Sequence, residues 1–319
     1  MLDVLFTVDV EVWCDGWDSI DEKFPSAFKK YIYGHTNKGN YGLPYQLKIF
    51  EEFDISAVFF VEPLFAGRFG QQPLAEIVGL IKDVGQEVQL HLHPEWVDEA
   101  LEPIIEDLVG KKQYLRFFTL EQQEQIIAIG SQWLKQAGGT NINAFRAGGF
   151  GFNSDTLIAL KKNNINFDSS YNATHMGLDS GLMNGTILTE PIISAGVYEY
   201  PMTIYYDRRN HLRHTQLTAC SFREIEGLLW QALEQERKSF VILSHNFELM
   251  NNTLTQANPI VVKRFNKLCD FLNKNRDCFN VSGFNDLKPK LADKQPSPLK
   301  SPLWKTGMRT LEQFWGSYT

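Results

Sequence analysis

Cysteine and histidine are both scarce in this chain of 319 residues, which has four of the first and seven of the second. The cysteines are too far apart to form a C-x-x-C pair, which predicts reduced thiols of a cytoplasmic protein rather than a disulfide framework. The scarcity of histidine draws attention to "QLHLHPEW" (89–96), where His91 and His93 lie two positions apart. Either both side chains point the same way and bind a common ligand, or they are surface residues that lie close in the sequence by chance.

Long hydrophobic runs and an excess of basic residues are also missing. No stretch reaches the ~20 apolar residues of a membrane-spanning helix. The first residues, "MLDVLFTVDVEVW", are interrupted by acids and have no basic segment, so no signal peptide is expected. The net charge of −7 argues against nucleic acid as a partner. No glycine-rich phosphate-binding motif follows a predicted strand, which removes the usual nucleotide-binding signals.

What the sequence does contain is an alternation of short apolar runs and amphipathic stretches, which predicts a parallel sheet covered by helices. This pattern suits a (β/α) barrel, complete or distorted, with an open doubly wound sheet as the alternative. The predicted strands are 2–10, 55–62, 86–93, 142–148, 165–170, 197–206, 239–246 and 278–284. The predicted helices are 44–54, 73–85, 119–139, 153–164, 221–237 and 258–275.

We expect residues 1–288 to form this single domain and residues 289–319 to form a linker and a C-terminal amphipathic tail. The stretch 289–303 is rich in Pro, Lys and Ser, as linkers are. After it, Trp304, Met308, Leu311 and Trp315 follow helical spacing and predict a helix that packs on the domain. A contact with a partner or a membrane surface is the less favoured alternative. The cationic segment "YYDRRNHLRH" (205–214) is interpreted as a solvated hairpin, although it could meet a phosphate.

Polar side chains gather where the predicted strands end. In a barrel of parallel strands the chemistry lies at these carboxyl ends. A single such residue is usually a loop cap or a salt-bridged surface group, but the repetition on five strands favours a functional site. The residues are Asp9, Glu11, His91, His93, Arg146, Asp168 and His245.

The spacing of these residues predicts a metal site. Side chains at i and i+2 of a strand point to the same face, so His91 and His93 can aim two imidazoles at one point. With Glu11 they make the three-ligand set of an open catalytic zinc site. Asp9 could then take a proton from the attacking water, and Arg146 could hold Asp9 ionised. His245 could protonate a leaving nitrogen, so the set suits hydrolysis of an amide or ester.

These motifs resemble those of the NodB-type polysaccharide deacetylases, carbohydrate esterase family four. The matching segments are "TVDVE", "HLHPEW", "FRAGGFG", "DSS" and "VILSHN", in family order between residues 7 and 246. The resemblance implies a distorted (β/α)7 barrel that removes N- or O-acetyl groups from sugars with a divalent metal. It makes Asp9 the base, Glu11 a ligand and Asp168 a supporting residue.

The sequence departs from the family pattern at three motifs. Val10 separates Asp9 from Glu11 where the family has adjacent aspartates. One residue rather than three separates the histidines, and Gly148 and Gly149 stand where the family has a Pro nearby. These departures resemble a divergent WalW-like branch associated with intracellular lipopolysaccharide or capsule biosynthesis. They leave the substrate open: an acetylated sugar or glycan precursor, free or linked to a nucleotide or lipid.

Candidate substrate contacts surround these motifs. Aromatic faces can stack on sugars, and polar side chains can bind their hydroxyls, although packing of the loops explains each residue about as well. The candidates are Trp13, Trp17, Trp96, His35 and Asn246.

Other functions fit parts of the pattern. One alternative is a metal-independent, allantoinase-like amide hydrolase. Another is a non-catalytic carbohydrate-binding protein on the same fold, which the intact set of polar residues disfavours. The amidohydrolase barrel also uses an H-x-H pair, but there it ends the first strand, whereas here it ends the third predicted strand.

Overall fold

A computed structural model describes residues 1–183 and 186–316 of the chain. Two compact units make up the protein, and each is described by itself. Unit 1 consists of Met1–Ala57, Thr203–Ser282 and Ser297–Thr319, and unit 2 of Val58–Met202 and Gly283–Pro296. The segment 289–319, expected as linker and tail, is therefore divided between the units. Its residues 317–319 lie outside the described part.

Unit 1 is built around strand β1 (Leu2–Val10), in which all nine residues are buried. A strand without an exposed face predicts apolar layers on both sides. β1 pairs in parallel with β12 (Ser239–His245), and its first residues pair with β13 (Phe279–Val281). Phe6 packs edge-on against Phe50, at 4.9 Å between ring centroids, and against Phe265. These rings join the strand to helices α2 (Leu43–Glu52) and α8 (Pro259–Lys274).

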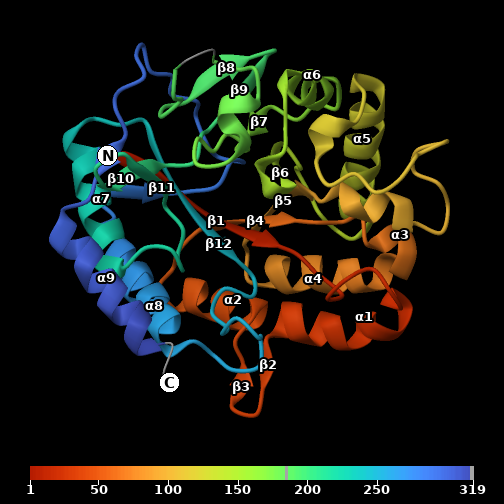
Figure 1. The fold of residues 1–319 in the computed structure, drawn as a ribbon, viewed down its shortest axis with the longest axis horizontal. Coiled ribbons are helices and arrows are strands. Elements are labelled where there is room, and N and C mark those ends of the chain that lie inside the picture. The colour runs from red at the N-terminus through yellow and green to blue at the C-terminus, as the bar shows by residue number, and fades with distance from the viewer. Residues whose placement is uncertain (184–185, 317–319) are drawn as a thin grey trace. The chain divides into compact units, whose positions relative to one another are not determined.

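The remaining elements of unit 1 are shorter or lie toward its edges (Figure 1). The segment after β1 forms α1 (Ile20–Phe28), a π-helical turn at Lys29–Tyr33 and the small ribbon of β2 (His35–Thr36) and β3 (Gly39–Asn40). β10 (Ile204–Arg208) and β11 (His211–His214) form the hairpin expected from the cationic segment, and β14 (Leu299–Lys300) pairs with β10. Helices α7 (Phe222–Glu234) and α9 (Leu303–Gly316) complete the unit.

Unit 2 contains a sheet of order β4-β5-β6-β7-β9-β8, parallel except for the pair of β8 and β9. Its helices begin where the sequence provides capping groups. Thr119 and Gln122 form a capping box at the start of α5, and Asn153 and Thr156 form one at the start of α6. The strands are β4 (Ala57–Val61), β5 (Glu87–Leu92), β6 (Ala144–Ala147), β7 (Phe167–Asp168), β8 (Ile192–Ser194) and β9 (Val197–Glu199). The helices are α3 (Ala66–Phe69), α4 (Gln71–Asp83), α5 (Leu120–Gln136) and α6 (Ser154–Lys162).

The predicted α/β class with mainly parallel strands is confirmed. One predicted strand, 197–206, is wrong: β9 ends at Glu199, Pro201 follows, and β10 begins at Ile204 in the other unit. Proline has no N–H to donate to a strand ladder, which explains a break there. Helix α1 was not predicted, because Pro25 lies inside it and obscures its pattern. Among the described residues, no helix has the length and apolar character needed to cross a membrane.

Candidate active site

The acidic motif of unit 1 lies at the carboxyl end of β1. Asp9 is paired in register with His245, the last residue of β12, and Glu11 follows one residue after the strand. One possible ligand atom from each of Asp9, Glu11 and His245 lies within 4.8 Å of those of the other two. The parallel register of the two strands thus brings His245 next to two acids that lie 234 and 236 positions earlier in the chain. This group could hold a metal ion.

Glu11 is held in place from two sides. The indole N–H of Trp13 donates to Oε2 of Glu11 at 2.7 Å. Asn246 accepts the backbone N–H of Glu11 at 3.0 Å and donates to the carbonyl oxygens of Glu11 and Tyr31. These bonds give the buried Asn246 a structural role between the ends of β1 and β12, so its expected contact with substrate is not supported.

His245 lies between two carboxylates. Its Nδ1 is 3.5 Å from Oε1 of Glu248, and its Nε2 is 4.0 Å from Oε1 of Glu11. Burial alone would lower the pKa of His245, but Glu248, Glu11 and Asp9 together raise it to about 9. The imidazole is therefore charged at neutral pH and can donate a proton.

Glu248 was missed by the sequence analysis. It is buried and accepts hydrogen bonds from Thr218, at 2.9 Å, and from Gln216. Its only sequence signal is its place three residues after His245, and a turn there brings the two side chains together. Its carboxylate can orient the imidazole of His245.

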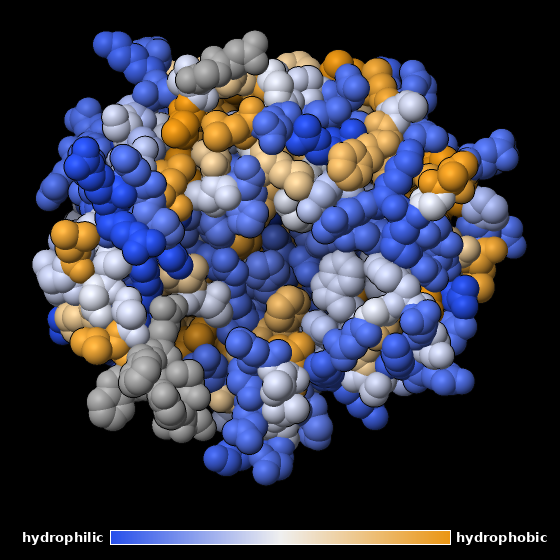
Figure 2. All heavy atoms as spheres, in the orientation of Figure 1, coloured by the Kyte–Doolittle hydropathy of each residue, from blue (hydrophilic) through white to orange (hydrophobic). Residues whose placement is uncertain are grey.

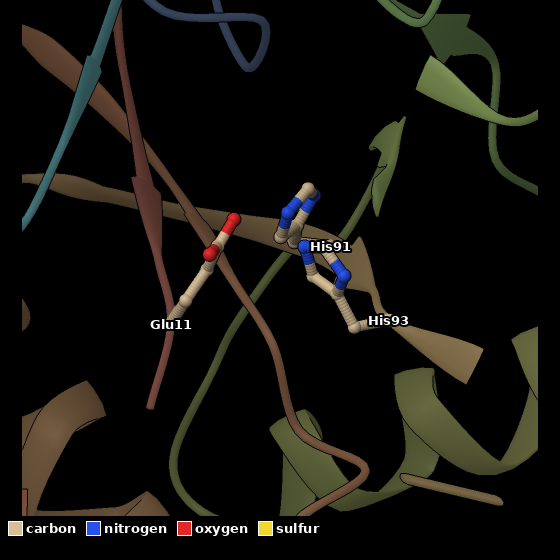
Figure 3. Close-up of side chains that lie close together, drawn as sticks. All are labelled: Glu11, His91 and His93. Atoms are coloured by element: carbon tan, nitrogen blue, oxygen red, sulfur yellow. The ribbon is translucent and has the colours of Figure 1, made fainter. Parts of the chain in front are cut away.

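In unit 2, the two histidines of the "HLH" stretch project from the end of β5. Their ring centroids are 4.8 Å apart, as expected for side chains on one face of a strand. Figure 3 shows both rings, drawn together with Glu11 of unit 1. Nδ1 of His91 donates to the carbonyl oxygen of Arg146 at 2.8 Å, which leaves the lone pair of Nε2 available to a ligand. Metal-binding histidines are fixed in this way.

Two further acids lie near His93. Nδ1 of His93 is 3.4 Å from Oε2 of Glu95. Glu62, the residue after β4, accepts the backbone N–H groups of Leu64 and Phe65. Burial raises the pKa of Glu62 to about 8, although these hydrogen bonds and His93 act in the opposite direction. Glu62 was missed although it is the acid that ends "AVFFVE", so reading the end of every predicted strand would have found it.

Arg146, predicted at the end of β6, is completely buried. Its Nε donates to the carbonyl oxygen of Ser169 at 3.0 Å, and its guanidinium carbon lies 4.5 Å from the ring centroid of Phe60. These contacts are all within unit 2. The expected pairing of Arg146 with Asp9, which belongs to unit 1, stays a prediction.

Asp168 is also completely buried and accepts a hydrogen bond from Ser170 at 2.5 Å. It stands in register with Glu199 of β9. Burial raises the pKa of both carboxyl groups, and the charge of Asp168 raises that of Glu199 further, so we expect Glu199 to hold the proton of the pair. Glu199 was missed because it lies inside the segment wrongly predicted as one strand.

The remaining substrate candidates differ in exposure. Trp13 and Trp17 are half-buried and pack edge-on at 6.1 Å, which leaves them surface that a sugar could contact. His35 is exposed on the β2–β3 ribbon, and its Nδ1 lies 3.0 Å from Oδ1 of Asn40. Trp96 is only 1% exposed, so it has no face to offer to a sugar.

Comparison with solved structures identifies the fold. A Mycobacterium smegmatis protein assigned as a polysaccharide deacetylase matches with a TM-score of 0.55 and 17% identity, over 93% of this chain and 94% of that one. The chain has the fold of a polysaccharide deacetylase. A 4-alpha-glucanotransferase from Thermococcus litoralis also gives a TM-score of 0.55, at 11% identity, over 92% of this chain and 42% of that one. No family model and no curated protein matches the sequence.

The comparisons therefore confirm the fold that the motifs implied. Two proteins whose descriptions name different reactions match it equally well, so the reaction must be argued from the site residues.

Proposed function

We propose that the protein is a metal-dependent hydrolase that removes an N-acetyl, or O-acetyl, group from a sugar. The observation that carries the proposal is the cluster of Asp9, Glu11 and His245 at the ends of two paired strands. It supplies a carboxylate base and a charged histidine acid on the fold of a polysaccharide deacetylase. Amide and ester hydrolysis needs both kinds of group.

The proposed metal ligands are Glu11, His91 and His93, and zinc is the proposed ion. The donor set fits because a carboxylate and two imidazoles are the protein ligands of open catalytic zinc sites. The fixed ring of His91 and the anchored carboxylate of Glu11 support it. A bound zinc ion would supply a Lewis acid for the acetyl carbonyl.

The chain's own residues perform the proton transfers in this proposal. The Asp9 carboxylate accepts a proton from the attacking water, assisted by the charge of Arg146. His245, kept protonated by Glu248, donates a proton to the leaving nitrogen or oxygen. Asp168 supports the buried Arg146 from within unit 2 and does not contact the substrate.

The proposed substrate is an acetylated sugar of cell-surface polysaccharide or lipopolysaccharide synthesis, free or linked to a nucleotide or lipid. The WalW-like motif spacing supports this assignment, and Trp13 and Trp17 offer aromatic surface for the sugar. We place the protein in the cytoplasm, because all four cysteines are free thiols.

The test is acetate release from a panel of N-acetyl and O-acetyl sugars, with the protein stripped of metal and then given zinc. We expect release only with the ion, and its loss in His91→Ala and His93→Ala. His211→Ala, on β11, serves as the control at a histidine that has no proposed role in binding or catalysis. Cleavage of an amide without metal would favour the allantoinase-like alternative, and sugar binding without release would favour the non-catalytic one.

A further inference from the structure

Helix α9 is attached to unit 1 by its polar side. Arg309 is only 5% exposed. Its guanidinium donates to Glu224 on α7 at 2.8 Å and to Asp207 on β10 at 2.7 Å. Thr306, one turn earlier, donates to the carbonyl oxygen of Asp207 at 2.9 Å. These buried charges hold the helix in one orientation.

The apolar side of α9 consequently faces outward. Leu303, Trp304 and Leu311 are 69%, 56% and 61% exposed. They lie at positions i, i+1 and i+8 of one helical face, opposite Arg309. An amphipathic helix of a globular protein normally buries its apolar face. Here the helix packs on unit 1 as predicted, but Trp304 and Leu311 of the predicted stripe are exposed, whereas Met308 is half-buried. The side chain of Trp315 lies outside the described residues.

A third ion pair, in addition to the two that Arg309 forms, fixes the same orientation of the helix. Nη2 of Arg264, on α8, lies 2.8 Å from Oε2 of Glu312 on α9. The helix is thus tied to three other elements of unit 1 through charged side chains. Its exposed apolar face is a fixed feature of the surface and not a frayed end.

Basic residues lie near both ends of this helix. A hollow of about 540 Å³ at the start of α9 is lined by Arg208, Arg209, Lys300 and Leu303, among others. A second hollow, near the other end, is lined by Arg223, Lys263 and Lys267. Among the described residues that line these hollows, Glu312 is the one acid, and it is paired with Arg264. A positive surface stands out in a chain whose net charge is −7.

We propose that α9 and the basic residues beside it form a docking surface for an anionic phospholipid bilayer. Leucine and tryptophan on one helical face, bordered by Lys and Arg, are what a helix needs to lie in the headgroup region of such a bilayer. Figure 2 shows apolar atoms beside strongly hydrophilic ones at the edge where Figure 1 places α9. The surface shares no residue with the proposed active site, so the two proposals can fail independently.

The experiment measures flotation of the full-length protein with vesicles of about 30% phosphatidylglycerol in phosphatidylcholine, and with pure phosphatidylcholine vesicles. We expect binding to the anionic vesicles only. Removing three cations in R208A/R209A/K300A, or three apolar side chains in L303S/W304S/L311S, should weaken binding at least about tenfold. A melting curve for each variant checks that it folds.

Two matched controls distinguish binding through this surface from non-specific adsorption of the protein to vesicles. K135A/K161A/K162A removes three exposed cations from unit 2, and L101S/V109S removes two exposed apolar side chains. Both controls should bind as the wild type does. Equal binding by the α9 variants, or absence of wild-type binding to anionic vesicles, would overturn the proposal. So would a lipid-free dimer that L303S/W304S/L311S converts to a monomer, because a second copy would then cover the face.

Discussion

The two polar clusters of the molecule use the same kinds of residue in different surroundings. In unit 1, His245 keeps 22% of its side chain exposed and is charged between Glu11 and Glu248. In unit 2, Arg146, Asp168 and Glu199 have no exposed surface. A group that exchanges protons with a substrate must be reachable, whereas a buried charge must be paired. Under the proposed function, the first cluster carries out proton transfer and the second supports the site, and four substitutions test this contrast.

His245→Ala should have the largest effect on catalysis. Loss of a general acid lowers the rate by about 10²–10⁴-fold. Acetate release at saturating sugar measures kcat, while calorimetric titration with the sugar checks that binding survives. A variant with more than half of the wild-type kcat would show that His245 is not the acid.

Arg146→Ala should have the largest effect on stability. The charge of Arg146 lowers the pKa of the buried Asp168, so its removal leaves that carboxyl group without its nearby cation; such a loss between buried charges costs about 3–5 kcal/mol. Urea unfolding gives the free energy of unfolding, and Arg276→Ala is the matched control at a surface pair with Asp54. If both variants unfold at the same urea concentration, the supporting role of the buried cluster is wrong.

Glu248→Gln should lower kcat by about tenfold and change its pH dependence. The Glu248 carboxylate helps to raise the pKa of His245, so its removal lowers that pKa. A general acid is active while it is protonated, and the alkaline limb of the kcat profile should therefore move to lower pH. An unmoved alkaline limb would separate Glu248 from the proton transfer.

Glu199→Gln should have the smallest effect, below about 1 kcal/mol near pH 5, because glutamine also donates a hydrogen bond and has no charge to lose. The wild-type pKa is raised in the folded state, so the native protein holds more protons than the unfolded chain. Wild-type stability accordingly falls as pH rises above the ordinary pKa of glutamate, about 4.3. The variant should lack this contribution and gain stability relative to the wild type at higher pH. Parallel unfolding curves across pH would refute the assignment of the proton.

Much of the site could be predicted because it follows from strand geometry. Reading the last residues of the predicted strands found Asp9, His91, Arg146 and His245, since i and i+2 side chains share a face. The same rule would have found Glu62. Glu199 was hidden by an incorrect strand boundary at Pro201.

The remaining features depend on contacts distant in sequence. The helical period identified which residues of α9 share a face, but it does not determine which way that face turns. The orientation is determined by the two partners of Arg309. These are Asp207 and Glu224, which lie 102 and 85 positions earlier in the chain. Similarly, nothing in the sequence before the fold was known singled out Glu248 as the partner of His245.

Metal analysis of the purified protein tests the central claim most directly. After reconstitution with zinc and removal of excess ion, the wild type and His245→Ala should each hold about one zinc per chain, as an open catalytic site does. Glu11→Gln, His91→Ala and His93→Ala should hold less than about a tenth of that, because each loses one of three ligands. A wild type that stays free of metal, or a Glu11→Gln variant that retains it fully, would contradict the proposed site.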